Sequence, residues 1–482
     1  MNYRMVIYII GQMMKVEGLL MFMPLITAII YNESVLPFVI PIAVLLGVGL
    51  AVTVKPPKNK ALRAREGFAC VGLCWIVLSV FGALPFVISG STVTFTDALF
   101  ESVSGFTTTG ASVISDVEVL DKGILFWRSL THWIGGMGVL VFVLAVLPKA
   151  DAKSGRLMHL MRAEVPGPTV GKLSPKITQT ARVMYAIYVV LTLIEVVFLL
   201  FGGMSLFDAL IHSFGTAGTG GFSIKNASVG AYNSAYIEYV IGAFMLLFGM
   251  NFNLFYLILI GHFLKALKSE ELWSYLIIIT VAVTTITFNI MPLYQGGEES
   301  FRMAFFQVAS IISTTGYSTT DFGSWPMLSQ AILVILMFFG GCAGSTAGGV
   351  KVGRAILLVK NAAREIRYIL HPRTVASVKI DGKAVDNETI RGSTSYLIVY
   401  LCIFVLSIIG IIALNGCDLV TGFTSVASCL NNIGPGLAEV GPTSNFGILS
   451  GLSKWILSFD MLAGRLELFP ILMLFSRSTW KK

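Results

Sequence analysis

Ten apolar runs are each long enough to cross a lipid bilayer, and they limit the possible folds more than any other feature of the sequence. A helix needs about 20 residues to span the hydrocarbon core. The runs lie near residues 4–31, 35–54, 68–89, 124–148, 180–203, 235–263, 272–292, 328–360, 393–414 and 449–475. The short alternating strands of a membrane barrel are not visible. The sequence therefore predicts an all-α protein that crosses the membrane ten times.

Composition excludes most enzyme classes. Only 12% of the residues are charged, whereas soluble domains carry about 25%. The six cysteines and five histidines are dispersed, without the spacing of a disulfide framework or a zinc site. The glycine patterns of P-loops and dinucleotide-binding folds are absent from the sequence. We therefore expect no enzyme, no catalytic residue and no cofactor bound by this chain.

The net charge of +8 is distributed by topology. Basic residues gather in three connections, at 55–65, 149–182 and 351–373, whereas the connections of opposite parity are acidic or sparse in charge. This asymmetry is typical of the positive-inside rule. It predicts a multi-pass protein with both termini in the cytoplasm, and it explains the basic charge without a nucleic-acid partner.

After the first two runs, the sequence divides into four units with a shared pattern. Each unit holds an apolar helix, a short semi-polar stretch, an irregular segment and a second helix. The short stretches are DALFESVSGFTTTGAS (97–112), DALIHSFGTAGTGGFS (208–223), MAFFQVASIISTTGYS (303–318) and TGFTSVASCLNNIGPG (421–436). A glycine stands 13 residues after the start of each, at Gly110, Gly221, Gly316 and Gly434. Four unrelated turns are the alternative, which the shared spacing disfavours.

Each short stretch is predicted to be a half-helix that enters the membrane and turns back. Thr94-x-x-Asp97 and Ser205-x-x-Asp208 have the spacing of a capping box, which starts a helix. About ten apolar or small residues then precede the glycine, roughly half a crossing. We expect four pseudo-symmetric helix–pore-helix–filter–helix repeats around one central pore, plus an N-terminal two-helix hairpin. The predicted divisions are 1–66 for the hairpin, then 67–178, 179–270, 271–391 with a broken inner helix, and 392–482 for the repeats.

Irregular backbone at membrane depth is tolerated only where it is buried or lines a water-filled cavity. Four such segments around one axis would present a ring of carbonyl oxygens, the arrangement with which potassium-channel filters replace the hydration shell of the ion. The C-terminal ends of the four half-helices would add negative potential. The predicted filter for K⁺ consists of Thr108, Thr109, Gly110, Thr219, Gly220, Gly221, Thr314, Thr315, Gly316, Asn432, Ile433 and Gly434.

The eighth run contains a glycine-rich stretch, FFGGCAGSTAGGVK, in mid-membrane. Each glycine costs about 1 kcal/mol relative to alanine in a helix, so an interruption is expected here. A close contact between helices is the alternative. We predict a mobile loop below the filter that gates the pore, with Gly344, Ser345, Thr346, Gly348 and Gly349 as its central residues. Lys351 follows it, either reaching the pore or the cytosolic interface, or acting as a positive-inside anchor.

Several polar residues lie within apolar runs. Arg465 is in the last run, where an intramembrane charge is by default a functional candidate; we predict a positive barrier below the filter, with an ion pair to Asp460 or Glu467 as the alternative. Interhelical hydrogen bonds are favoured over ion contact for three further residues. These are Glu195, Asn251 and Asn253. Packing roles are favoured for His132 and Trp133, and the direction of His212 is undetermined.

The sequence resembles the Trk/Ktr/HKT superfamily of cation transporters, most closely its bacterial TrkH-type membrane subunits. The resemblance covers essentially the whole chain. It rests on SGFTTTGAS, TGGFS, STTGYSTTD and NNIGPGL at the four predicted filter segments, and on RSLTHWIGGMGVLVFVLAVLP (128–148), NFNLFYL (251–257), GGCAGSTAGGVKVGR (340–354) and DMLAGRLELFP (460–470). The second segment has Gly220 where a hydroxyl residue commonly stands, and the fourth has Asn432 and Ile433.

The resemblance implies one ion pathway per subunit, a homodimer, and a cytosolic ring of the TrkA/KtrA type that regulates opening. ATP, ADP or NAD(H) would then bind the ring, docked on the basic connections at 149–182 and 351–391, although anionic lipid would suit these connections equally. The glycine at position 110 favours potassium over sodium. The expected function is gated, channel-like potassium uptake across the bacterial inner membrane. A proton- or sodium-coupled symporter, and a weakly selective K⁺/Na⁺ permease, remain alternatives.

Overall fold

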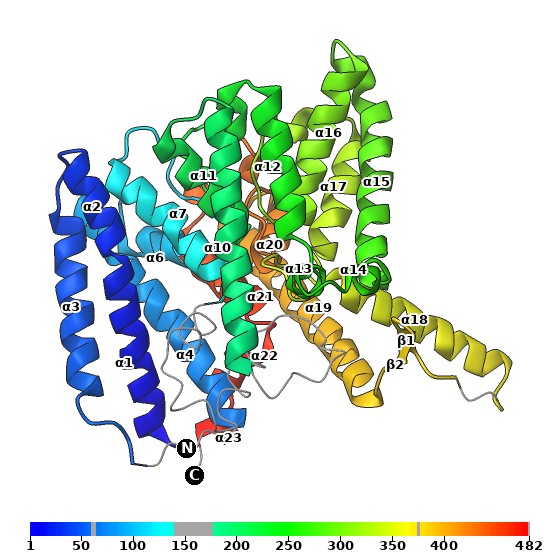
Figure 1. The fold of residues 1–482 in the computed structure, drawn as a ribbon, viewed down its shortest axis with the longest axis horizontal. Coiled ribbons are helices and arrows are strands. Elements are labelled where there is room, and N and C mark those ends of the chain that lie inside the picture. The colour runs from blue at the N-terminus through cyan, green and yellow to red at the C-terminus, as the bar shows by residue number, and fades with distance from the viewer. Residues whose placement is uncertain (59–63, 139–176, 374–375, 481–482) are drawn as a thin grey trace.

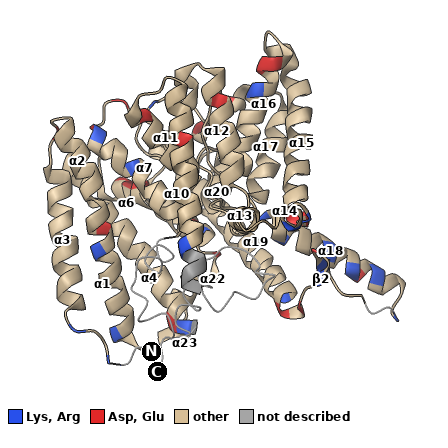
Figure 2. Cartoon of the chain, in the orientation of Figure 1, with Lys and Arg blue, Asp and Glu red and all other residues tan. Residues whose placement is uncertain are grey.

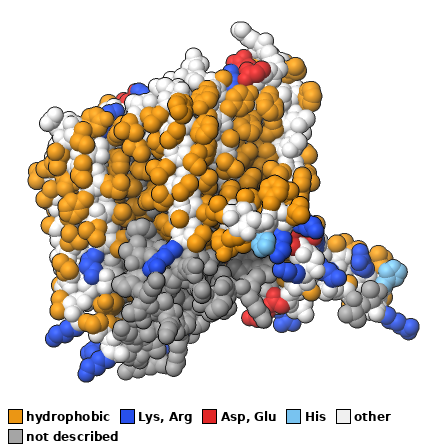
Figure 3. Space-filling model, in the orientation of Figure 1, with side chains coloured by type: hydrophobic (Ala, Val, Ile, Leu, Met, Phe, Trp, Pro, Cys, Tyr) orange, Lys and Arg blue, Asp and Glu red, His pale blue; other side chains and the backbone are white. Residues whose placement is uncertain are grey.

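A computed structural model describes residues 1–58, 64–138, 177–373 and 376–480. Figure 1 shows the helices standing side by side in one block, with both termini together at one end. Charged residues gather near the two ends of the helices and along one projecting helix (Figure 2). Apolar side chains cover the face between them (Figure 3). This distribution is the one expected of a protein surrounded by lipid.

Six described helical segments are long and apolar enough to cross a membrane, or seven if one bent pair counts as a span. Their helices are α1 (Tyr3–Leu20) with α2 (Phe22–Ile30), α3 (Leu36–Thr53), α4 (Ala64–Gly82) with α5 (Leu84–Ser89), α10 (Ile177–Phe201), α15 (Glu270–Ile290) and α19 (Asn387–Asn415). The predicted all-helical architecture is confirmed. Among the described residues the strands are β1 (Lys379–Ile380) and β2 (Lys383–Ala384), one antiparallel hairpin.

The remaining predicted spans differ from straight helices. Run 235–263 is not one straight helix, because α12 (Ala235–Phe248) and α13 (Phe252–Leu259) are bent by 89°. Run 449–475 likewise divides into α21 (Gly451–Arg465) and α22 (Phe469–Phe475). Between them Glu467 and Leu468 have φ values of 53° and 66°, which no helix continues through. Run 124–148 begins as α7 (Lys122–Gly136), and its residues 139–148 lie outside the described part.

The glycine-rich interruption of the eighth run is present. Helix α17 (Met327–Phe339) ends at Gly340, and α18 (Val352–Leu370) begins only after Lys351. We call residues 340–351 the intramembrane loop. Helix α18 then projects from the helical block together with the β hairpin, as Figure 1 shows.

Four short helices occupy the positions predicted for the half-helices: α6 (Phe95–Phe106), α11 (Leu206–Gly218), α16 (Gly297–Ile312) and α20 (Leu419–Leu430). Both predicted helix starts are confirmed, with Thr94 and Ser205 as side-chain N-caps. Thr94 accepts from the backbone N–H of Asp97 at 3.1 Å and donates to its carboxylate at 2.8 Å, and Ser205 makes the same pair of bonds with Asp208. Helix α16 starts six residues before the aligned stretch, so the third half-helix is the longest.

One carboxylate ties the turn of the N-terminal hairpin to the start of α7. Glu33, between α2 and α3, accepts hydrogen bonds from the backbone N–H groups of Lys122 at 2.6 Å and Gly123 at 2.8 Å. These are orphan donors at the first turn of α7, and an anion there is favoured by the helix dipole.

Replacing Glu33 by alanine is therefore expected to lower stability by about 1 kcal/mol, as for the loss of a helix cap. The measurement is thermal unfolding of the purified protein in detergent. Glu33→Gln, which keeps one acceptor, should unfold closer to the wild type. Identical unfolding of the alanine variant and the wild type would show that this cap does not hold the hairpin.

Candidate functional site

The structure brings the four predicted filter segments together in a closed ring. We call residues 108–110, 219–221, 314–316 and 432–434 the ring segments. A Cβ added at Gly110 would collide with the carbonyl oxygen of Gly220, one at Gly221 with that of Thr315, and one at Gly316 with that of Ile433; one at Gly434 would stand 2.9 Å from the carbonyl oxygen of Thr109. Each ring glycine thus packs on the carbonyl that precedes the next ring glycine, and the fourth segment closes on the first.

The backbone of the four ring segments is the same. The first residue of each has a left-handed conformation, with φ of 55° at Thr108, 57° at Thr219, 57° at Thr314 and 56° at Asn432. The next residue donates to the carbonyl five positions earlier: Thr109 to Ser104 at 2.9 Å, Gly220 to Gly215 at 2.8 Å, Thr315 to Ser310 at 2.9 Å and Ile433 to Ser428 at 2.9 Å. These are Schellman motifs. All four half-helices therefore end with the same backbone geometry, and each ring segment follows its half-helix in the same way.

Threonine is an unusual residue for this conformation. A β-branched side chain at positive φ is a genuine outlier, and the left-handed region costs an L-residue about 1–2 kcal/mol. Three of the four ring segments begin with such a threonine, fully buried. Strain of this kind persists only where the surroundings over-determine it, and it clusters at functional sites.

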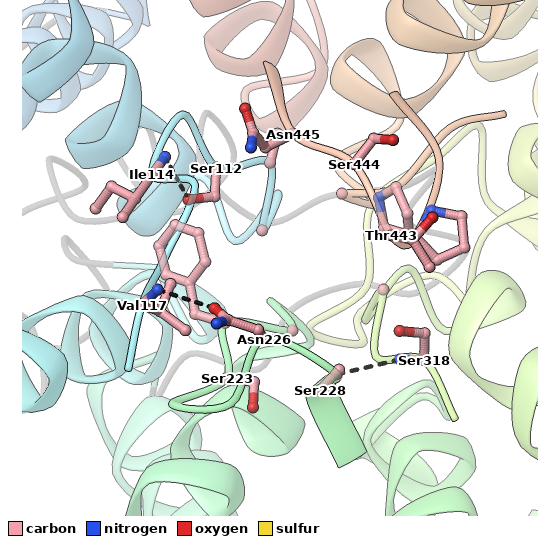
Figure 4. A pocket seen from close by; sticks show the side chains of 18 of the residues that line it. Ser112, Ile114, Val117, Ser223, Asn226, Ser228, Ser318, Thr443, Ser444 and Asn445 are labelled. Carbon is pink, nitrogen blue, oxygen red and sulfur yellow. Dashed lines mark hydrogen bonds between the residues drawn. The ribbon is translucent and has the colours of Figure 1, made fainter. Parts of the chain in front are cut away.

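An open pocket of about 180 Å³ stands over the ring glycines, and Figure 4 shows its lining. All four ring glycines contribute, as do three serines at equivalent positions in the first three repeats, Ser112, Ser223 and Ser318. Hydroxyls and backbone therefore dominate its base. Farther out, the carboxylate of Glu118 accepts from the backbone N–H of Asn226 and pairs with Lys225 at 3.2 Å; these two contacts lower the pKa of Glu118.

A buried ion pair lies beside the ring segments, where its arginine also lines the pocket, and the sequence reasoning missed it. Arg128 on α7 and Glu101 on α6 are joined at 2.7 Å and are nearly inaccessible to solvent. Arg128 also lies over the ring of Phe222 at 4.0 Å and donates to the carbonyl of Ser223 at 3.3 Å. Glu101 accepts from the backbone N–H of Val113 at 3.0 Å. The rule that points to Arg465, charge within an apolar run, would have found Arg128 in run 124–148, whereas Glu101 stands in a semi-polar stretch between runs.

The intramembrane loop lies directly against the ring. The backbone N–H of Gly348 donates to the side chain of Thr314 at 2.7 Å, and a Cβ at Gly348 would collide with the carbonyl of Asn431. On its other side, Thr346 donates to the carbonyl of Phe248 at 3.2 Å. The loop contacts the ring where the half-helices end, whereas the pocket opens at the ring glycines. Of the predicted gate residues, Gly348 is the one in direct contact with a ring side chain.

Arg465 lies in contact with the same loop. Its guanidinium donates to the carbonyls of Thr346 at 2.7 Å, and of Gly135 and Gly136 at 2.6 Å each. The two predicted ion-pair partners are engaged elsewhere, so that alternative is corrected: Glu467 pairs with Arg354 at 2.9 Å, and Asp460 accepts from Ser407 at 2.9 Å. Arg465 thereby links the loop to the end of α7.

Lys351 and Glu271 fix the ends of the loop. Lys351 is buried and donates to the carbonyl of Ala347, so it lies inside the protein rather than at an exposed cytosolic surface. Glu271 on α15 accepts from the backbone N–H groups of Ala343 at 2.7 Å and Gly353 at 2.9 Å, one on each side of the break. The sequence reasoning missed Glu271, because it stands at the polar start of a run.

The other polar residues have mainly structural contacts. Asn251 caps α13 by accepting from the backbone N–H of Asn253 at 3.0 Å, and its side chain is also hydrogen-bonded to Glu271 on α15, an interhelical contact as predicted. Glu195 is buried beside Thr216. Trp133 donates to Thr192 at 3.3 Å and stacks on Tyr188, which confirms its packing role. The Nε2 of His212 faces the hydroxyl of Ser223 at 3.2 Å.

Comparison with known proteins gives this architecture a family. A family model described as TrkH, a cation transport protein, matches residues 38–482. The chain belongs to the TrkH family. It is 37% identical over 494 residues to the Trk system potassium uptake protein TrkH of Halomonas elongata, and 38% identical over 489 residues to that of Escherichia coli K12, covering 100% of both chains in each case. The crystal structure of the potassium transporter TrkH from Vibrio parahaemolyticus matches with a TM-score of 0.89 and 35% identity over 100% of both chains.

Membership of the TrkH family confirms the resemblance predicted from the motifs. Together with the apolar helices, it makes this chain a multi-pass membrane protein. The assignment concerns the chain as a whole. The roles of the ring segments, of the intramembrane loop and of Arg465 in ion passage stay predictions, as do the residue boundaries of the four repeats.

Proposed function

We propose that this chain is the membrane subunit of a potassium-uptake system and that K⁺ passes through the ring. The names of its TrkH relatives support the choice of ion. The observation that carries the proposal is the closure of the ring, in which each ring glycine rests on the carbonyl preceding the next one. Four identical backbone segments around one axis suit a spherical ion better than they suit an asymmetric organic substrate.

The ring would select ions with backbone carbonyls that replace part of the hydration shell. The C-terminal ends of α6, α11, α16 and α20 meet the ring segments, and each contributes about half a negative charge of dipole potential. An inside-negative membrane potential supplies about 2.3 kcal/mol per charge per 100 mV for entry. No further energy source is needed for uptake along this route.

The intramembrane loop, Lys351 and Arg465 would form the gate. The loop occupies the path directly beside Thr314 and Asn431, and Arg465 adds positive charge there. Opening then requires the loop to leave the ring, which breaks the bonds from Gly348 and Arg465. Five loop glycines lower the resistance of the backbone to such a movement.

Regulation would come from a partner, in keeping with the predicted homodimer and a cytosolic TrkA/KtrA-type ring that binds ATP, ADP or NAD(H). The described parts of the predicted docking surface are 177–182, 351–373 and 376–391, and they include the projecting helix α18, which carries Lys360, Arg364 and Arg367 (Figure 2). The other part, 149–176, lies outside the described residues. Figure 1 shows both termini at one end of the helical block. The chain would sit in the bacterial inner membrane with this end in the cytoplasm.

The proposal is tested by rubidium and sodium flux into liposomes that contain the purified chain, driven by an imposed inside-negative potential. We expect rubidium flux to exceed sodium flux several-fold. Equal fluxes would favour the weakly selective permease. Flux that appears only with an added proton or sodium gradient would favour the symporter, and flux that appears only after addition of a cytosolic nucleotide-binding ring would support regulation by that partner.

A further inference from the structure

The four ring segments are supported in different ways. In the first, the hydroxyls of Thr107 and Thr109 are 2.8 Å apart; in the third, those of Ser313 and Thr315 are 2.7 Å apart. The second segment has Gly218 and Gly220 at the equivalent positions and therefore lacks this hydroxyl pair. Something else must hold its backbone in the same geometry.

His132 on α7 occupies this place. Its Nδ1 lies 2.9 Å from the carbonyl oxygen of Gly105, and its Nε2 lies 3.3 Å from the backbone nitrogen of Phe222. A carbonyl can only accept a hydrogen bond and a backbone N–H can only donate one, so the imidazole of His132 is neutral and carries its proton on Nδ1. Gly105 belongs to the end of the first half-helix, and Phe222 follows the second ring glycine. One imidazole thus bridges the first two repeats.

The glycines of the second segment make room for this imidazole. A Cβ at Gly220 would collide with the ring of His132, and a Cβ at Gly218 would collide with its backbone carbonyl. The imidazole of His132 also packs on the side chain of Phe222, with the two ring centroids 4.2 Å apart, and His132 is completely buried. Gly220, which stands where other repeats have a hydroxyl residue, and His132 therefore depend on each other: the imidazole occupies the space that a side chain at position 220 would need. We call this pair the steric unit.

We propose that His132 is a positioning residue for ion selectivity, replacing in the second repeat the hydroxyl pair that supports the first and third. Its two hydrogen bonds fix the spacing between the end of α6 and the segment after Gly221. The carbonyl of Gly220, which faces Gly110 in the ring, is held between these two points. The inference rests on the proposed function, because it assumes that the ring carbonyls select the ion.

The test compares rubidium and sodium flux through His132→Phe with the wild type in liposomes. Phenylalanine keeps a planar ring but removes both hydrogen bonds. We expect the rubidium-to-sodium ratio to fall about fivefold or more, the factor that the loss of one ordinary hydrogen bond gives. A purely structural role would reduce the amount of folded protein and both fluxes in proportion, leaving the ratio unchanged. His262→Phe is the matched control, since His262 is exposed outside the ring.

A second pair of variants tests the steric unit. Gly220→Ser with His132 present should lower the ratio, whereas Gly220→Ser combined with His132→Ala should recover part of it, because the serine then has the space that repeats 1 and 3 provide. A selective wild type with an unchanged ratio in His132→Phe, or no recovery in the double variant, would overturn the inference alone. Equal rubidium and sodium fluxes in the wild type would overturn the potassium assignment and the inference together.

Discussion

Gly316→Ser is expected to abolish the preference for rubidium over sodium. The new Cβ would collide with the carbonyl oxygen of Ile433 and stand 2.9 Å from Pro435, at a residue whose φ is 85°. Left-handed backbone costs a serine about 1–2 kcal/mol, and overpacking adds about 1–3 kcal/mol. The ring carbonyls must then move by more than the difference in radius between the rubidium and sodium ions. The ratio of rubidium flux to sodium flux should therefore approach one.

The control lies in the same repeat. Gly296 is the N-cap of α16, in extended backbone with open space where a Cβ would be. Serine is preferred at that position, so Gly296→Ser should keep the wild-type ratio and stability. If Gly316→Ser conducted with unaltered selectivity, the ring carbonyls would not be the element that distinguishes the ions, whatever the control does.

Arg465→Ala is expected to raise rubidium flux about tenfold, equivalent to about 1.4 kcal/mol in favour of the open state. The side chain donates to one carbonyl of the intramembrane loop and two of α7. Hydrogen bonds from a charged group contribute about 1.5–3 kcal/mol each, so its removal frees the loop and also removes a positive charge from the path. Initial flux rates per reconstituted protein measure the effect.

Arg465→Lys separates the two causes. Lysine keeps the charge, but a single ammonium cannot reproduce the planar fork that reaches three carbonyls. If the tether closes the gate, the lysine variant should conduct like the alanine variant; if the charge is the barrier, it should conduct like the wild type. Unchanged flux in both variants, with normal expression, would remove Arg465 from the gate.

The sequence predicted the elements whose causes are local. Helix starts at Thr94 and Ser205 follow from one capping pattern, and the break after Phe339 follows from a run of glycines. The bend between α12 and α13 was missed, since Gly249 and Asn251 are only two polar or flexible residues in a strongly apolar run. Short breaks of this kind do not lower the average hydropathy enough to mark a boundary.

The meeting of the four filter segments could be predicted from their shared pattern, but their backbone conformation and their individual side-chain partners could not. Threonine gave no sign of a left-handed conformation at 108, 219 and 314, because its intrinsic preference opposes it and only the assembled ring imposes it. For Arg465, the alternative of an ion pair with the nearest carboxylates in the chain is wrong, because the structure supplies backbone carbonyls more than 100 residues away. Proximity in sequence is a poor guide once half-helices fold back.

The closed ring has a consequence for how such a site diverges. In an assembly of four identical subunits, every substitution would appear in all four ring segments. The space that His132 takes beside Gly220 would then have to exist four times. In this protein the four ring segments belong to four different stretches of one chain, so each can change on its own. The second repeat can have an imidazole where others have a hydroxyl pair, and the fourth can carry Asn432, which donates to Thr109 at 3.0 Å, while the first and third repeats have their hydroxyl pairs. Joining the ring segments in one chain makes asymmetry available to selection.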